Sequence, residues 1–140
     1  MPRRSRARQV AFQILYREDL NPGEDPAGDR HLIESRLGSA ELIEFAAALV
    51  AGVRSRRGPL DEAIQSAARN WDLHRMAATD RNVLRLGAYE LLWTDTPARV
   101  ALDEAVELAK RFGTAQSAGF VNGILDHLMH CHLPPQAEGE

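Results

Sequence analysis

The sequence of 140 residues carries a formal net charge of −3, with 44% apolar and 26% charged residues. This length suits one domain, or two packed halves with a common core, and the charged fraction argues against disorder. No apolar run approaches the roughly 18 residues that a membrane span requires, and the basic N-terminus lacks the apolar block of a secretory signal. The single cysteine, Cys131, excludes an intrachain disulfide and is typical of the reducing cytoplasm, where we expect the protein.

The apolar residues recur at helical spacing along most of the chain, and no run shows the clean alternation of a strand. Helix-forming residues such as Ala, Leu, Glu and Arg dominate the composition. The expected helices span residues 4–20, 29–37, 39–57, 59–71, 77–93, 100–112 and 117–130. Trp71 closes the apolar stripe of the fourth helix, and the longest connection is the loop 21–28. Seven helices with short connections predict an all-α fold.

The helix ends follow from capping and turn residues. Ser5 and Ser39 are predicted N-caps of the first and third helices, and Gly38 is predicted to end the second in the left-handed conformation. Pro59 is predicted as the first residue of the fourth helix. A glycine inside the fifth helix, Gly87, costs about 1 kcal/mol against alanine, which predicts a close approach of another helix there.

Four arginines lie within the first two turns of the first helix: Arg3, Arg4, Arg6 and Arg8. Guanidinium groups this close repel one another unless an anion is present, and their planar forks suit phosphate. The pattern therefore indicates a polyanion-binding arm. The alternative interpretation is a solvated, frayed N-terminus without function.

Phe120 lies at the rim of the apolar stripe of the last helix. It is either part of the core or a half-exposed platform on which an unpaired base stacks, a contact worth about 1–3 kcal/mol per base. Spacing alone favours the core. Gly119 and Gly123 flank Phe120, and we interpret this pair of small residues as close helix packing.

Helix dipoles explain the positions of several other charged residues, so these residues need no catalytic role. Asp103 and Glu104 are expected near the start of the sixth helix, where the helix dipole favours negative charge. Lys110 and Arg111 are expected in its last turn, where the dipole favours positive charge. No pocket or substrate motif accompanies the carboxylates, so we expect no acid–base catalysis.

Possible metal ligands gather only at the end of the last helix, at His127, His130, Cys131 and His132. The spacing could place ligands on one face, but no second cluster completes a tetrahedral site. Walker A, GxGxxG, HExxH, GxSxG and CxxC motifs are absent from the sequence. We therefore expect no catalytic residue, no cofactor and no metal.

Four blocks of the sequence resemble the NusB family of bacterial transcription antitermination factors. In chain order they are RRSRARQVAFQILYREDL, LVAGV, DRNVLRLGAYELL and VALDEAVELAKRFGTAQSAGFVNGILD. The last block is the specific one, because it joins an EAVELAK run to FVNG through a glycine and a short loop. Together the blocks extend over nearly the whole chain.

This resemblance implies one all-helical domain, residues 1–140, with two packed helical subdomains. The halves are expected at about 1–70 and 71–133, followed by a disordered tail, 134–140. The resemblance implies no enzyme activity. It implies that the chain pairs with NusE, a small-subunit ribosomal protein, and binds boxA RNA of ribosomal RNA leaders. The pair then supports RNA polymerase in antitermination.

The same resemblance assigns site residues. The expected RNA contacts are Arg3, Arg4, Arg6, Arg8, Tyr16, Phe120 and Asn122. Phe120 is expected to stack on a base, and Asn122 to hydrogen-bond a base edge or hold its loop. The expected contacts to the NusE-like partner are Tyr16, Asp80, Arg85 and Gln116.

Two alternatives come from other classes of protein. A NusB-like domain also begins certain ribosomal RNA cytosine methyltransferases, but the expected end at PPQAEGE leaves no room for a methyltransferase domain. The second is a protein scaffold in which apolar helix faces form a homodimer and the arm is idle.

Overall fold

The computed structural model describes residues 3–132, and the predicted tail 134–140 lies outside this range. The described chain forms seven α-helices and two short 3-10 turns without a strand, which confirms the predicted all-α class. The elements are α1 (Arg3–Leu20), η1 (Pro26–Gly28), α2 (Asp29–Arg36), α3 (Ala40–Ser55), α4 (Arg57–Ala67), η2 (Leu73–Arg75), α5 (Ala78–Trp93), α6 (Ala98–Phe112) and α7 (Ser117–His132).

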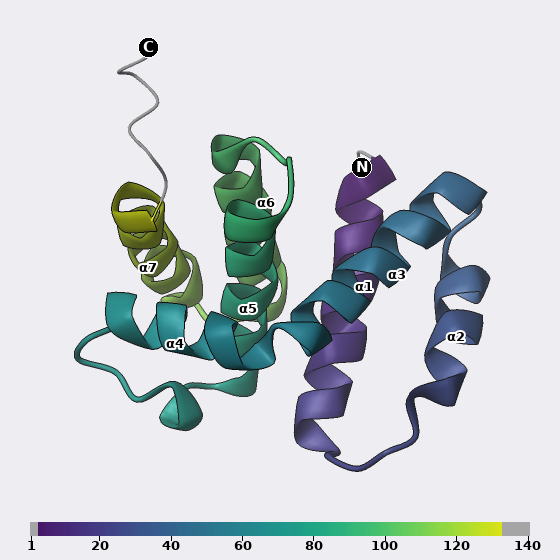
Figure 1. Cartoon of the computed structure of the whole chain (residues 1–140), viewed down its shortest axis with the longest axis horizontal. Helices are drawn as coiled ribbons and strands as arrows, with labels where there is room; N and C mark the ends of the chain where they lie inside the picture. Colours follow the sequence, from purple (N-terminus) through teal and green to yellow (C-terminus); the bar gives the residue numbers. More distant parts are fainter. Residues whose placement is uncertain (1–2, 133–140) are drawn as a thin grey trace.

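Helix α5 is the centre of the fold. It packs against α1, α3, α4, α6 and α7, and every residue from Asn82 to Ala88 is buried. A helix that is buried on all sides carries apolar residues around most of its circumference, as the sequence LRLGAYELL does. Figure 1 shows α1, α2 and α3 on one side of the molecule and α4 to α7 on the other. Helix α4 packs on α5 and α7, and the predicted division at about residue 70 stays a prediction.

Several predicted helix ends are corrected by the structure. Helix α1 begins at Arg3, so Ser5 lies inside it and is no cap. Among residues 3–132 only Gly23 has a positive φ, so Gly38 does not adopt the left-handed conformation. Pro59 is the third residue of α4 and not the first as predicted. It is tolerated there because N–H groups in the first turn of a helix have no carbonyl partner within the helix, so a missing N–H costs no hydrogen bond. The predicted cap at Ser39 is confirmed, because its hydroxyl accepts a hydrogen bond from the Leu42 amide.

The fourth helix is also shorter than predicted. It ends at Ala67, and Trp71 lies beyond it with 57% of its surface exposed. The prediction that Trp71 belongs to the core stripe is therefore wrong. The turn after Ala68 carries the indole out of the helical register.

Two glycines permit close contacts of α5. A Cβ on Gly87 would lie 2.8 Å from Leu125 Cδ1 and 3.0 Å from Ala105 Cβ, which confirms the predicted close approach. On α3, a Cβ on Gly52 would lie 2.1 Å from Tyr89 Cζ and 2.2 Å from its hydroxyl oxygen. The ring of Tyr89 thus occupies the volume that any other residue at position 52 would need.

We expect Gly52→Ala to lower the free energy of unfolding by about 1–3 kcal/mol, because the rigid tyrosine ring must move to admit the new methyl group. Thermal unfolding measures the change. Gly58→Ala in α4 is the matched control, since a Cβ at Gly58 meets nothing within 4 Å. Equal melting temperatures of the two variants would contradict this packing argument.

Candidate nucleic-acid interface

Three of the N-terminal arginines are exposed on the first turns of α1. Arg3 donates to the Ser39 hydroxyl over 3.1 Å, and Arg4 lies 3.7 Å from a Glu41 carboxylate oxygen. Arg6 is exposed and makes no ion pair with another described residue. These polar contacts lie at the surface, so they are weak and can be exchanged for other partners. Arg4 Cζ also lies 4.6 Å from the ring centroid of the half-buried Phe45.

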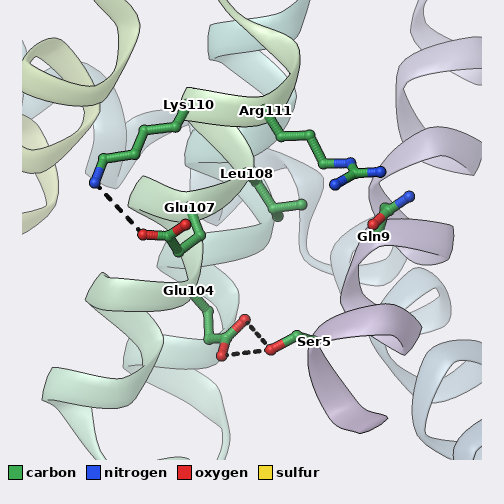
Figure 2. A pocket seen from close by; sticks show the side chains of 7 residues that line it. All are labelled: Ser5, Gln9, Glu104, Glu107, Leu108, Lys110 and Arg111. Atoms are coloured by element: carbon green, nitrogen blue, oxygen red, sulfur yellow. Dashed lines mark hydrogen bonds and ion pairs between the residues drawn. The ribbon is translucent and has the colours of Figure 1, made fainter. Parts of the chain in front are cut away.

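A groove with a volume of about 560 Å³ runs beside this arm, between α1 and α6 (Figure 2). Its lining residues are Ser5, Gln9, Glu104, Glu107, Leu108, Lys110 and Arg111. The Ser5 hydroxyl lies 2.8 and 2.7 Å from the two carboxylate oxygens of Glu104 and ties the two helices together at one end of the groove.

The cations of the groove lie on the last turn of α6. Lys110 Nζ is 3.5 Å from Glu107, a surface pair of little strength. Arg111 forms no ion pair within residues 3–132, and in Figure 2 its side chain extends toward Gln9 of α1. Arg111 therefore adds an accessible guanidinium to the three on α1. From the sequence, Lys110 and Arg111 were explained by the helix dipole, and only packing places them beside the arm.

Arg8 is different from the other arginines of the arm. Only 4% of its surface is exposed, and its Nε and Nη2 donate to the two carboxylate oxygens of Glu90 over 2.7 and 2.8 Å. Glu90 is itself 2% exposed and belongs to α5. A buried guanidinium with a bidentate carboxylate partner does not reach a surface phosphate. The prediction that groups Arg8 with the phosphate-binding arginines is corrected on this ground.

A second ion pair involves Arg85, which is 3% exposed and pairs with a partly exposed carboxylate. Its Nε and Nη2 donate to the Asp61 carboxylate over 2.8 and 3.0 Å. These hydrogen bonds hold the side chain within the protein, and the prediction that Arg85 contacts a partner is corrected. It holds α4 against α5 instead.

The carboxylate of Asp19 joins the same network. It accepts hydrogen bonds over 2.8 Å from Arg81 Nε and from Asn82 Nδ2, and Arg85 Nη1 lies 3.6 Å away. Burial alone would raise the pKa of Asp19. The hydrogen bonds from Asn82 and Arg81 and the charges of Arg81 and Arg85 outweigh burial, so the pKa lies below its ordinary value of 3.8.

The other expected partner contacts lie at or near the surface. Asp80 is half-buried in the first turn of α5, and its Oδ1 has no hydrogen-bond partner among the described residues. Tyr16 is half-buried, with its ring centroid 5.9 Å from that of Phe12. Gln116 is exposed in the turn before α7. Their roles stay predictions.

The FVNG segment forms the first turns of α7. Phe120 is half-buried, and its ring packs edge-on against Trp71 with 5.2 Å between centroids. Asn122 is exposed on the same helix and makes no side-chain hydrogen bond within the described chain. No binding role for Trp71 was predicted from the sequence, because its position in the apolar stripe is typical of a core residue.

Metal sites and membrane spans are two further features that side-chain clusters or apolar helices could indicate. No group of three or more His, Cys, Asp or Glu side chains within residues 3–132 is arranged to hold a metal ion. Over the same residues, no helix has both the length and the apolar character needed to cross a membrane.

Comparison with known proteins places this geometry in a family. The model of the NusB family matches residues 5–130. The transcription antitermination protein NusB of Anaeromyxobacter dehalogenans is 45% identical over 139 residues, which cover 99% of this chain and 97% of that protein. The protein of the same name from Saccharopolyspora erythraea is 46% identical over 133 residues, covering 91% and 87%.

Solved structures agree with the sequence comparison. The structure of T. maritima NusB has a TM-score of 0.83 and 38% identity, covering 96% of this chain and 94% of that one. A crystal structure of the antitermination factors NusB and NusE in complex with dsRNA has a TM-score of 0.83 and 28% identity, covering 93% and 98%. The family match, the near full-length relatives and the shared all-helical fold together show that this chain belongs to the NusB family.

Proposed function

We propose that this protein is a transcription antitermination factor, without enzyme activity, that binds boxA-type single-stranded RNA of ribosomal RNA leaders together with NusE. Its near full-length relatives bear the name transcription antitermination protein, and a structural neighbour was solved with NusE and RNA. The protein then acts in the cytoplasm, within the antitermination complex of RNA polymerase.

The observation that carries this proposal is the exposed arginine cluster of α1 beside the α6 groove. Arg3, Arg4, Arg6 and Arg111 present guanidinium groups that can exchange weak surface contacts for phosphate. Arginine binds phosphate through two parallel hydrogen bonds, which also orients the nucleic acid. Although the chain carries a net charge of −3, this cluster can attract a polyanion locally.

Base recognition falls to the FVNG segment in this proposal. Phe120 offers an aromatic face for stacking, and Asn122 offers an amide that can pair with a base edge. Tyr16, Asp80 and Gln116 contact the NusE-like partner. Arg8 and Arg85 are both buried and contribute indirectly, because their ion pairs hold α1 and α4 on α5.

The test is a salt series with a boxA-type single-stranded RNA, in the presence and absence of NusE. Replacing Arg3, Arg4 and Arg6 together by alanine is expected to reduce the slope of log K against log salt by about 2, since each lost phosphate contact on a single strand contributes roughly 0.7. Fluorescence anisotropy at several salt concentrations measures this slope.

The matched control replaces Arg30, Arg36 and Arg99 by alanine, which changes the net charge equally at three exposed positions elsewhere. Its slope is expected to stay within experimental error of the parent protein. Equal slopes for the two triple variants would show that the arm does not touch phosphate. A failure of the parent protein to bind RNA when NusE is present would overturn the proposed function.

The same proposal includes a homodimer, in which a second copy of the chain covers the arm and so competes with RNA for it. Size-exclusion chromatography with and without RNA measures it. We expect added RNA to shift the population toward the monomeric protein–RNA complex.

A further inference from the structure

A second groove, with a volume of about 380 Å³, lies between the end of α4 and the helix α7. Its walls include two aromatic side chains, Trp71 and Phe120, in edge-to-face contact with 5.2 Å between ring centroids. Trp71 is 57% exposed, the largest exposed fraction among the large apolar residues of the described chain. An exposed indole held by a second ring leaves aromatic surface available to a flat ligand.

The floor of this groove is the bare backbone of α7. Gly119 and Gly123 lie one turn apart in the helix, and a Cβ added at either position meets nothing within 4 Å. The prediction that this pair serves close helix packing is therefore wrong. Glycine weakens a helix relative to alanine, and no neighbouring element of the fold requires it here. The two glycines do keep the space beside Trp71 and Phe120 open.

The charges around the groove favour an anionic ligand. Arg69 lines it, is exposed, and makes no ion pair with any residue from 3 to 132. The remaining polar lining residues are Asn70 and His127, and no carboxylate lines the groove although the chain has 20 acidic residues. A neutral peptide would leave Arg69 without a counter-charge, and a purely acidic peptide would leave the two aromatic rings without a flat partner. A nucleotide supplies both a ring and a phosphate.

This second groove is connected to the first groove, beside the arginine arm, by a short segment of the chain. Arg111 lines the first groove at the end of α6, and Phe120 lines the second in the first turn of α7. Only the turn 113–116 separates the two helices. A single strand that leaves Arg111 can therefore follow this turn to Phe120.

We propose that Trp71, together with Phe120 and Arg69, forms a stacking subsite for an unpaired nucleobase and its phosphate, at the far end of the RNA path. This inference rests on the proposed function, but it assigns a site beyond the arginine arm. The ring of the base lies against the indole over the glycine floor, and the phosphate pairs with Arg69. Duplex RNA does not fit this contact, because its bases are already stacked.

Tryptophan fluorescence tests the stacking directly. The chain has two tryptophans, and Trp93→Phe leaves Trp71 as the only one. Titration of this variant with a single-stranded RNA of about 12 nucleotides is expected to quench its emission, because such a strand is long enough to extend past one binding site. A duplex of the same sequence is expected to leave the emission unchanged. The reciprocal variant, Trp71→Phe, reports on Trp93 and is expected to show no quenching.

Binding measurements complete the test. Trp71→Ala is expected to weaken binding of the single strand by about 5- to 150-fold, the effect of losing one base–aromatic stack. Gly123→Leu is expected to weaken binding similarly while the melting temperature stays equal or rises, because the new side chain fills the groove without meeting the fold. Val100→Ala, at an exposed apolar residue outside the groove, is the control and is expected to bind like the parent.

The outcomes separate this inference from the proposed function. If the triple arginine variant loses affinity while Trp71→Ala and Gly123→Leu bind RNA like the parent, the subsite is wrong and the antitermination proposal stands. If both groove variants lose NusE binding in the absence of RNA, the groove docks a protein and the inference is overturned. Loss of RNA binding by both groove variants, with unchanged NusE binding, supports it.

Discussion

Replacing Glu90 by alanine is expected to lower the free energy of unfolding by about 3–5 kcal/mol, because it leaves the buried guanidinium of Arg8 without its counter-charge. Both side chains are almost completely buried, and two short hydrogen bonds join them. The hydroxyl of Thr96 also donates to Glu90 Oε2 over 3.1 Å and loses this acceptor. Glu104 lies 3.9 Å from Arg8 and already accepts a hydrogen bond from Ser5, so it is a weaker partner than the lost carboxylate.

Urea unfolding of three variants measures this effect. Arg8→Met combined with Glu90→Leu removes both charges, and we expect its stability to lie much closer to the parent than that of Glu90→Ala. Asp103→Ala, which breaks the exposed pair of Arg99 and Asp103, is the control with an expected loss below about 1 kcal/mol. A loss for Glu90→Ala as small as that of the exposed pair would show that Arg8 is hydrated in solution.

Asp19→Ala is expected to lower the free energy of unfolding by about 1.5–3 kcal/mol at neutral pH, the range for hydrogen bonds to a charged group. Arg81 and Asn82 both donate to this carboxylate. Arg81 also donates from Nη1 to the Met76 carbonyl oxygen over 2.8 Å, so it holds the segment before α5 in place. Without Asp19, Arg81 loses its carboxylate partner, while Arg85 keeps its ion pair with Asp61.

The same carboxylate makes stability depend on pH in a defined direction. Because the folded-state pKa of Asp19 is lowered, its contribution is fully present above the ordinary value of 3.8 and is lost as the pH falls through the folded-state pKa. Unfolding measured from neutral pH to about pH 2 should therefore show a smaller acid-induced loss in Asp19→Asn than in the parent. Parallel pH curves for the two proteins would contradict the role of Asp19.

Helix periodicity was sufficient to predict the seven helices, because a buried stripe requires apolar residues at i, i+3 and i+4 whatever lies against it. The helix ends were predicted less well. Ser5 has the chemistry of a cap, yet it lies within α1 and binds Glu104 instead. Trp71 has the register of the α4 stripe, yet the helix ends before it. In the folded chain Ser5 contacts Glu104 and Trp71 contacts Phe120, and both partners are distant in sequence.

The candidate site shows the same limit. Arg4 and Arg8 lie one turn apart on the same face of α1, and their sequence surroundings predict the same phosphate-binding role. Packing separates them, because α5 brings Glu90 against Arg8 while Arg4 lies near the open end of the helix. Arg111 gains its place beside the arm in the same way, through the packing of α6 along α1.

By itself the sequence determined the helices, the all-α class, the family and the basic character of the N-terminus, because each depends on local spacing or on a contiguous motif. Only the tertiary structure decided which charged groups are available to a ligand. A guanidinium has the same chemistry whether it is buried or exposed. The carboxylates that pair with it when it is buried, Glu90 for Arg8 and Asp61 for Arg85, are distant in sequence. Burial beside a carboxylate turns it into a structural element, and exposure leaves it free for phosphate.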